Sequence, residues 1–159
     1  MHCFKLLRRF TGVRSIASYT AAVTRKIDVS LVRDALRSNS DITIDLAKAI
    51  SQHHHLENVL KECGVKVSTL ESDGFPDSVF IEDTAVVIDK TAFITLPGAP
   101  SRRGETKRVA DYFKHVYGAT YQLVHQSNGT LDGGDVLFTG MSFYLFFVRN
   151  IIVSYVVLR

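Results

Sequence analysis

The same order of sequence patterns occurs twice along this chain of 159 residues. Each copy runs from a helix pattern to a glycine, an alternating strand, an acidic turn and an apolar strand. Gly64 and Gly118 end the two helix patterns, and Asp77 and Asp132 follow these glycines at nearly equal distances. Repeats of one strand-and-helix unit usually stack or close into a ring. The repeat therefore predicts an α/β fold in which Asp77 and Asp132 face the same central place.

The first copy contains the clearest helix pattern, which begins at Ile44 and stops at Gly64. The stretch VKVSTL then alternates as a strand, and the acidic turn ESDGFPD follows. After this turn, SVFIEDTAVVI and TAFITL are each predicted as a strand, joined by a turn at Asp89 and Lys90. The copy thus predicts one helix and three strands.

The second copy begins after the helix-breaking stretch PGAPS, in which Ser101 is the predicted helix cap. Apolar side chains at helical spacing follow, up to Gly118: Val109, Tyr112, Phe113 and Val116. The stretches ATYQLV and DVLFTG are then predicted as strands. SYTAAVT near the N-terminus is a further candidate strand.

The length fits one domain, and the net charge of +3 is distributed unevenly. Residues 1–26 carry all of their charge as Lys and Arg, so the remainder has 13 basic and 16 acidic residues. The basic residues of this segment are Lys5, Arg8, Arg9, Arg14, Arg25 and Lys26. Nucleic-acid binders spread basic residues over a folded face. The mildly acidic body therefore argues against nucleic acid as a partner.

The basic, acid-free leader has the composition of a mitochondrial transit peptide. The alternative is a basic tail that precedes a first strand. Cys3 and Cys63 are too few and too far apart for a disulfide framework or a zinc site. Few cysteines favour a reducing compartment, so we expect a cytoplasmic protein unless the leader directs mitochondrial import.

The last stretch, MSFYLFFVRNIIVSYVVLR, is apolar but has Arg149 and Asn150 in its middle. It falls short of the roughly 20 apolar residues that a membrane-spanning helix needs. We therefore expect a strand from Ser142 to Leu145 followed by a divergent apolar tail, rather than a membrane anchor.

A set of carboxylates inside or beside apolar stretches is the main chemical feature: Asp77, Glu82, Asp83, Asp132 and Asp135. An ionised carboxylate in a dry environment is costly unless amides, a cation or a metal satisfy it. No calcium-loop or phosphate-loop spacing is present, and Glu105 stands where a phosphate loop would need lysine. Two readings stay open. These acids form a pocket for a planar guanidinium, or Glu82 and Asp83 are turn or capping acids at a strand edge.

Other reactive side chains have simpler explanations. His53, His54 and His55 are consecutive on a helix, so they point in different directions and cannot converge on one metal ion. Cys63 lies at the end of a helix, whereas an activated thiolate is favoured at a helix start. The residues alone therefore predict no metal, no cofactor and no complete catalytic set.

Three long stretches, in order and correctly spaced, resemble the dimethylarginine dimethylaminohydrolases of the guanidine-modifying pentein superfamily: FPDSVFIEDTAVV, ITLPGAPSRR and TLDGGDVLFTG. The resemblance runs from about Ser18 to Leu145, which divides the chain into 1–17, 18–145 and 146–159. It implies an α/β-propeller of which this chain would hold two to two and a half of five strand-and-helix modules.

Members of this family hydrolyse asymmetric dimethylarginine and monomethylarginine to citrulline and a methylamine. By resemblance, Asp77, Glu82 and Asp83 hold the guanidinium and amino groups of the substrate. Arg102 pairs with its carboxylate, and Leu36 belongs to the loop that closes over it. Asp132 matches the acid that orients the catalytic histidine, and Gly133 and Gly134 let the backbone approach that centre.

The family's catalytic histidine and cysteine lie beyond the region that this chain matches, and the chain departs from the family pattern after MSFYL. Covalent catalysis needs both groups, so we expect the 159 residues to be inactive and poorly soluble alone. A rival reading is a non-catalytic module that binds methylarginine or associates with a full-length family member. Another is a relative that modifies guanidines differently, such as a deiminase.

Overall fold

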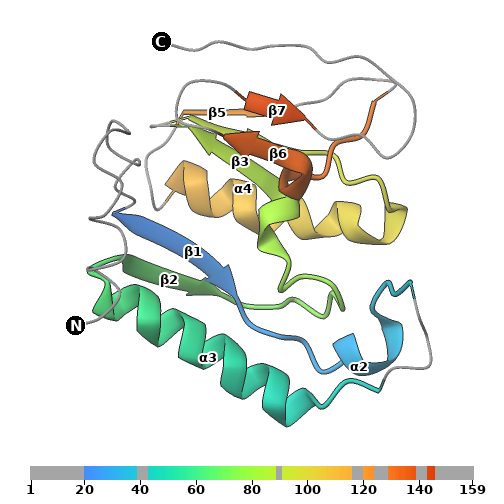
Figure 1. Cartoon of the computed structure of the whole chain (residues 1–159). Helices are drawn as coiled ribbons and strands as arrows, with labels where there is room; N and C mark the ends of the chain where they lie inside the picture. Colours follow the sequence, from blue (N-terminus) through green and yellow to red (C-terminus); the bar gives the residue numbers. More distant parts are fainter. Residues whose placement is uncertain are drawn as a thin grey trace.

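The computed structural model describes residues 20–38, 43–88, 91–115, 120–123, 129–138 and 143–145. Its first unit is a β–α–β arrangement of strand β1 (Ala21–Arg25), helix α3 (Leu46–Glu62) and strand β2 (Lys66–Leu70). The two strands are parallel neighbours, with Val23 opposite Ser68, and α3 lies along them (Figure 1). The short helix α2 (Leu31–Asp34) lies in the connection from β1 to α3. The predicted strand SYTAAVT is confirmed in its second half.

Local chemistry at both ends explains the bounds of α3. Asp45 precedes the helix, and its carboxylate accepts the backbone N–H of Lys48 at 3.0 Å, as an N-cap does. At the other end Gly64 adopts a φ of +83°, a left-handed conformation that glycine enters without a steric cost. The predicted helix is confirmed, with its start two residues later than the pattern placed it.

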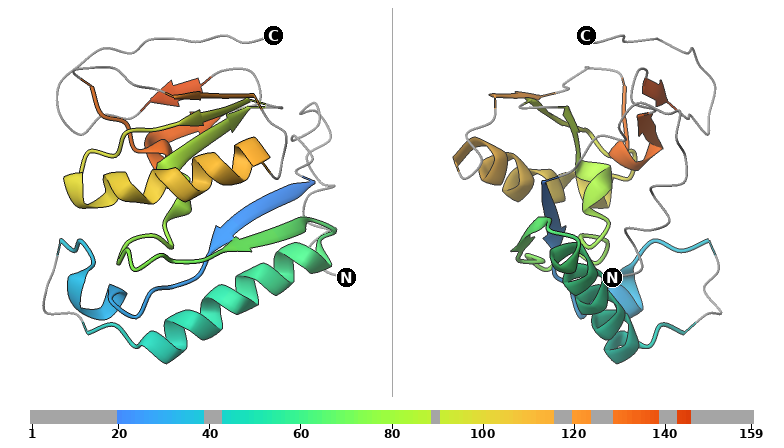
Figure 2. Two further views of the ribbon diagram at one scale, coloured as in Figure 1. Left: turned by 180° about the vertical axis from the view of Figure 1, so that it is seen from behind. Right: turned by 60° about the vertical axis from the view of Figure 1, so that its left-hand side comes forward.

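The second unit repeats the first and adds one strand. It contains β3 (Ala85–Ile88), β4 (Thr91–Ile94), helix α4 (Thr106–His115) and β5 (Thr120–Leu123). Strand β4 pairs antiparallel with β3 and parallel with β5, so β4–α4–β5 has the same parallel connection as β1–α3–β2. Figures 1 and 2 show each long helix lying along its own sheet. The predicted repeat is thus visible as two β–α–β units.

The hydrophobic core lies between α4 and β4. Its buried members are Ala92 and Ile94 from the strand and Val109 and Phe113 from the helix. Partly buried side chains of the first unit also pack against this core, namely Val23 and Leu70. The core therefore joins the two units, and Figure 2 shows α4 next to the sheet of β1 and β2.

The predicted strand SVFIEDTAVVI is wrong in its first half. Residues Ile81–Thr84 form a 3₁₀ helix, η1, and the strand β3 starts only at Ala85. The Thr84 hydroxyl donates to the carbonyl of Ile81 at 2.6 Å, and the Asp83 N–H donates to the carbonyl of Phe80. Short polar side chains compete with sheet pairing in this way, so Glu82 and Asp83 lie on a helical turn and not in a strand.

The predicted cap at Ser101 is also wrong. Residues Pro100–Glu105 form a second 3₁₀ helix, η2, and α4 begins after it at Thr106. Pro100 fits the first turn of a helix, where its missing N–H costs nothing. Gly104 lies so close to the Phe75 ring that a Cβ would overlap with it. The α-helix therefore begins at Thr106, five residues after the predicted cap at Ser101.

The last described segment contains the 3₁₀ helix η3 (Gly133–Asp135) and strands β6 (Val136–Phe138) and β7 (Phe143–Leu145), which pair antiparallel. The strands predicted in DVLFTG and at Ser142–Leu145 are confirmed over these residues. The predicted leader 1–17, Val116, Gly118 and the tail 146–159 lie outside the described residues. Within the described ranges, no helix is both long and apolar enough to cross a membrane.

Candidate substrate-binding site

Asp77 lies in the turn before η1 and is only 4% exposed. Both of its carboxylate oxygens lie within hydrogen-bond distance of the Leu36 N–H, at 3.1 and 3.2 Å. The Leu36 side chain itself is 57% exposed. A buried carboxylate thus connects the segment after α2 to the turn that leads into η1.

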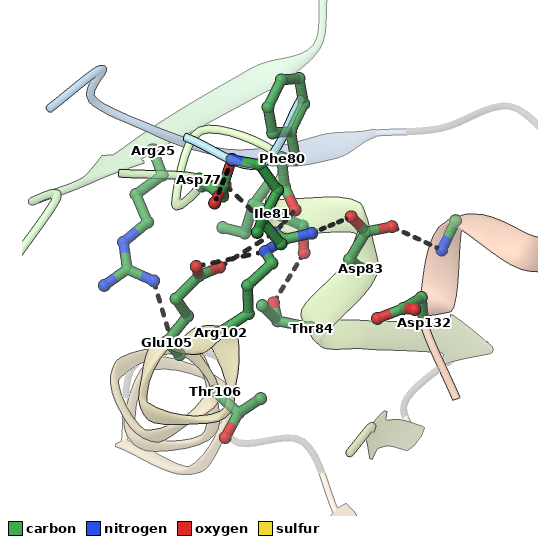
Figure 3. Close-up of polar contacts among 12 residues, drawn as sticks. Arg25, Asp77, Phe80, Ile81, Asp83, Thr84, Arg102, Glu105, Thr106 and Asp132 are labelled. Atoms are coloured by element: carbon green, nitrogen blue, oxygen red, sulfur yellow. Dashed lines mark hydrogen bonds and ion pairs between the residues drawn. The ribbon is translucent and has the colours of Figure 1, made fainter. Parts of the chain in front are cut away.

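Arg102 on η2 is the centre of the polar network drawn in Figure 3. Its guanidinium forms an ion pair with Asp83 and a second one with Glu105, in which Nη2 and Oε2 are 2.9 Å apart. Nη2 also donates to the carbonyls of Asp77 and Phe80, both at 3.1 Å. Burial alone would lower the pKa of Arg102, but the hydrogen bonds and charges of Glu105 and Asp83 outweigh burial and raise it. Arg102 is therefore permanently cationic.

Asp83 links this network to η3. One carboxylate oxygen pairs with Arg102, and the other accepts the Gly134 N–H at 3.2 Å. The Asp132 carboxylate lies on the far side of Asp83 in Figure 3 and accepts the Gly98 N–H at 3.3 Å. Figure 3 and these contacts bring Asp77, Asp83 and Asp132 into one polar region.

Gly133 permits the close approach of η3 to η1. A Cβ at this position would overlap with the carbonyl oxygen of Glu82 and would lie 3.1 Å from that of Ala85. A Cβ on Gly134 would meet the carboxylate of Asp83 in the same way. The two glycines therefore allow the backbone to reach the acids.

Asp135 adds negative charge to this region. Burial raises the pKa of its carboxyl group, and the charges of Asp132 and Asp83 raise it further. Like charges in one place disfavour ionisation of each member. A cationic ligand placed among these three carboxylates would relieve that repulsion.

Glu82 and Arg102, which the resemblance implicates in substrate binding, differ from the aspartates in their surroundings. The Glu82 side chain is exposed, and its Cγ would lie 3.5 Å from a Cβ placed on Gly134 of η3. Arg102 is buried, and its described partners are a carboxylate on each side and two backbone carbonyls. Its pairing with a substrate carboxylate stays a prediction, and that pairing would have to use the donor capacity that remains on Nη1.

Sequence reasoning missed two buried charged residues beside the acids, Arg25 and Glu105. Arg25 is 0% exposed, and its Nη1 donates to the carbonyl of Glu105 at 2.9 Å. In the sequence it counts as one more basic residue of the leader, and Glu105 counts only as a mismatch to a phosphate loop. The available signal was the position of Arg25 at the end of an apolar strand, where a charge needs partners.

The histidine run belongs to a separate polar cluster on α3. Glu57 is buried and accepts the hydroxyls of Thr24 at 2.6 Å and Thr69 at 2.7 Å. His53 Nε2 lies 3.4 Å from the same carboxylate, whereas the His54 side chain is largely exposed. Among the described residues, no three His, Cys, Asp or Glu side chains are grouped so that they could hold a metal ion. The cluster fastens α3 to both strands of its sheet.

Comparison with known proteins extends this picture. The family described as eukaryotic N,N dimethylarginine dimethylhydrolase matches residues 23–146. An N(G),N(G)-dimethylarginine dimethylaminohydrolase of Pseudomonas aeruginosa is 37% identical over 113 residues, which are 70% of this chain and 44% of that protein. The corresponding protein of Streptomyces coelicolor is 47% identical over 74 residues, which are 46% of this chain and 28% of that protein.

Solved structures agree with this match. The Pseudomonas aeruginosa enzyme, as a cysteine-to-serine mutant in complex with citrulline, superposes with a TM-score of 0.74 at 35% identity. The superposition covers 80% of this chain and 49% of that one. The N-terminal domain of ArgZ, an arginine dihydrolase, superposes with a TM-score of 0.69 at 21% identity and so supports the fold alone.

The comparisons confirm the predicted fold class, a partial pentein-like α/β arrangement. The chain spans about half the length, or less, of the relatives that it matches. The family match covers well over half of the chain and includes every residue of the polar region around Asp83. The chain therefore belongs to the dimethylarginine dimethylaminohydrolase family.

Proposed function

We propose that the acids around Asp83 form the substrate-recognition part of a methylarginine hydrolase. In this proposal Asp77 binds the α-amino group or the guanidinium of the substrate, and Asp83 and Asp132 lie beside its reacting end. The family to which the chain belongs hydrolyses methylated arginine, and a relative of 35% identity binds citrulline in a solved structure.

One observation carries the proposal. The Asp83 carboxylate accepts the Gly134 N–H of η3, and Asp132 and Asp135 lie at the two ends of that short helix, so three carboxylates lie in one place. Burial, and then the charges of Asp132 and Asp83, raise the pKa of Asp135. Arg102 cannot neutralise this group alone, because it shares its charge between Asp83 and Glu105. A guanidinium is a suitable additional cation, since its planar donors match carboxylate oxygens in pairs.

We further propose that these 159 residues bind methylarginine without turning it over. Within the described ranges the one cysteine is Cys63, which follows α3 at the far end of the first unit. The described histidines lie on α3 and at the end of α4. Among the described residues, these groups therefore lie outside η1 and η3, the elements that carry Asp83 and the acids beside it.

Isothermal titration of the chain with asymmetric dimethylarginine tests binding, and a citrulline assay tests turnover. Asp83→Asn should weaken binding at least about tenfold, because it removes a charge-assisted acceptor worth roughly 1.4 kcal/mol or more. Asp111→Asn on the exposed side of α4 is the matched control and should bind like the unchanged chain.

Three results would contradict parts of the proposal. Binding that is unchanged in Asp83→Asn would show that the acids are only turn and capping residues. Citrulline formation by the chain would exclude the binding-only reading. Preference for unmethylated arginine over asymmetric dimethylarginine would favour a deiminase instead.

A further inference from the structure

Glu105 is almost completely buried, with 1% of its surface exposed, although it carries a carboxylate. Its two oxygens accept two donors of one guanidinium: Arg102 Nε at 3.2 Å and Arg102 Nη2 at 2.9 Å. In a 3₁₀ helix, residues three apart lie directly above one another. The 3₁₀ conformation of η2 therefore places Arg102 and Glu105 on the same buried side, in a fork-like pair.

The orientation of this guanidinium decides where several groups of the proposed site lie. With Nε and Nη2 held by Glu105, Nη2 also faces the carbonyls of Asp77 and Phe80, and Nη1 faces the Asp83 carboxylate. The first two contacts hold the turn that carries Asp77, and the third holds Asp83 against Gly134 (Figure 3). Glu105 thus acts on both aspartates through one side chain.

Glu105 also affects the charge that a ligand would meet. Arg102 between two carboxylates leaves a net negative charge, whereas Arg102 paired with Asp83 alone would form a neutral pair. Loss of the Glu105 charge would therefore make Arg102 a stronger partner for Asp83. The carboxylate of Asp83 would then attract a cationic ligand less strongly.

The position of Glu105 is itself fixed from the first unit. Arg25 Nη1 donates to its carbonyl at 2.9 Å, Nε donates to the Glu71 carbonyl at 2.7 Å, and Nη2 pairs with Asp73 at 3.0 Å. Asp73 also pairs with Arg108 on α4. A chain of charges, from the buried Arg25 through Asp73 to the exposed Arg108, thus connects β1 and α4 to η2.

We infer that Glu105 is a positioning residue of the methylarginine site, which acts through Arg102 to set the placement and the net charge of Asp83 and of the Asp77 turn without touching the ligand. The predicted effect of Glu105 on ligand affinity rests on the proposed function. Its predicted effect on the positions of Asp83 and of the Asp77 turn does not depend on any ligand.

The test uses the full ¹⁵N-labelled chain with Glu105→Gln, which keeps the shape and removes the charge. Two backbone amides report placement, since the Leu36 N–H binds Asp77 and the Gly134 N–H binds Asp83. We expect both amide resonances to shift and their hydrogen exchange to accelerate. Affinity for asymmetric dimethylarginine, measured by titration, should fall about tenfold. Glu62→Gln at the exposed end of α3 is the matched control.

Glu105→Asp keeps the charge on a shorter side chain and should restore most of the affinity, a rescue that a purely structural role would not produce. Unchanged Leu36 and Gly134 amides in a folded Glu105→Gln chain would overturn the inference. Failure of both variants to fold would also overturn it, because Glu105 would then serve folding alone. If the unchanged chain binds no methylarginine, the proposed function fails. The Leu36 and Gly134 amides still show whether Glu105 positions Asp77 and Asp83.

Discussion

At the scale of single residues, the charge of Asp135 should make ligand binding depend on pH. Burial and the neighbouring Asp132 and Asp83 raise the pKa of Asp135, so it is protonated and neutral at pH values where an ordinary aspartate is ionised. A cationic ligand favours the ionised form. Affinity for asymmetric dimethylarginine should therefore fall on acidification, beginning above the usual aspartate range of about pH 4. Titration calorimetry at a series of pH values measures this dependence.

Asp135→Asn should remove this part of the pH dependence and lower the affinity at neutral pH. The same raised pKa means that ionising Asp135 costs folding free energy. Stability should thus decrease as the pH rises from the ordinary to the raised pKa, and less so in Asp135→Asn. An affinity that is independent of pH in the unchanged chain would show that Asp135 does not face the ligand.

At the scale of secondary-structure elements, the attachment of α4 depends on few apolar side chains. Phe113 is buried beside Val109, and both contact the strand residues Ala92 and Ile94. Phe113→Ala should lower the free energy of unfolding by about 3–5 kcal/mol, because it removes buried surface and leaves a cavity. Urea denaturation followed by circular dichroism measures the change.

Leu56→Ala is the matched control for Phe113→Ala. It also shortens a large apolar side chain on a helix, but Leu56 on α3 is 52% exposed. This substitution should change stability by no more than about 0.5 kcal/mol. Equal losses of unfolding free energy in Phe113→Ala and Leu56→Ala would mean that Leu56 is as well packed as Phe113, contrary to the observed exposure of Leu56.

At the scale of the whole molecule, η3 and the β6–β7 hairpin attach to the second unit through the close approach at Gly133. A Cβ there would overlap with the Glu82 carbonyl, so Gly133→Ala should push η3 away and break the Gly134 hydrogen bond to Asp83. We expect the α4 core to stay folded and methylarginine affinity to fall about tenfold. Hydrogen exchange at Gly134, with and without ligand, reports both effects.

Gly98→Ala tests the specificity of this effect, because a Cβ there would make only ordinary contact with Asp132, at 3.4 Å. It should retain exchange protection at Gly134. If Gly133→Ala binds methylarginine like the unchanged chain, η3 does not contribute to the site.

Hydrophobic period and turn residues were sufficient to predict α3, β2, β4 and β5, because these elements bury one apolar side and end at recognisable breakers. They failed at Ser78–Thr84 and at Ser101. The first segment ends in the 3₁₀ helix η1, and Ser101 lies within the 3₁₀ helix η2. Hydrogen bonds of side chains such as Thr84 and Arg102 stabilise these helices. A periodic pattern contains no information about such contacts.

Residue types and their spacing along the chain were sufficient to identify the repeated unit, the family and the acids. Which charged side chains lie together depends on how the chain folds. Arg25, on β1, donates to the backbone carbonyl of Glu105 on η2, and the Glu105 carboxylate orients Arg102 toward Asp83. Burying a charge is favourable only when partners surround it. Except for the Arg102–Glu105 pair within η2, these partners come from segments far apart in sequence, and only folding brings them together.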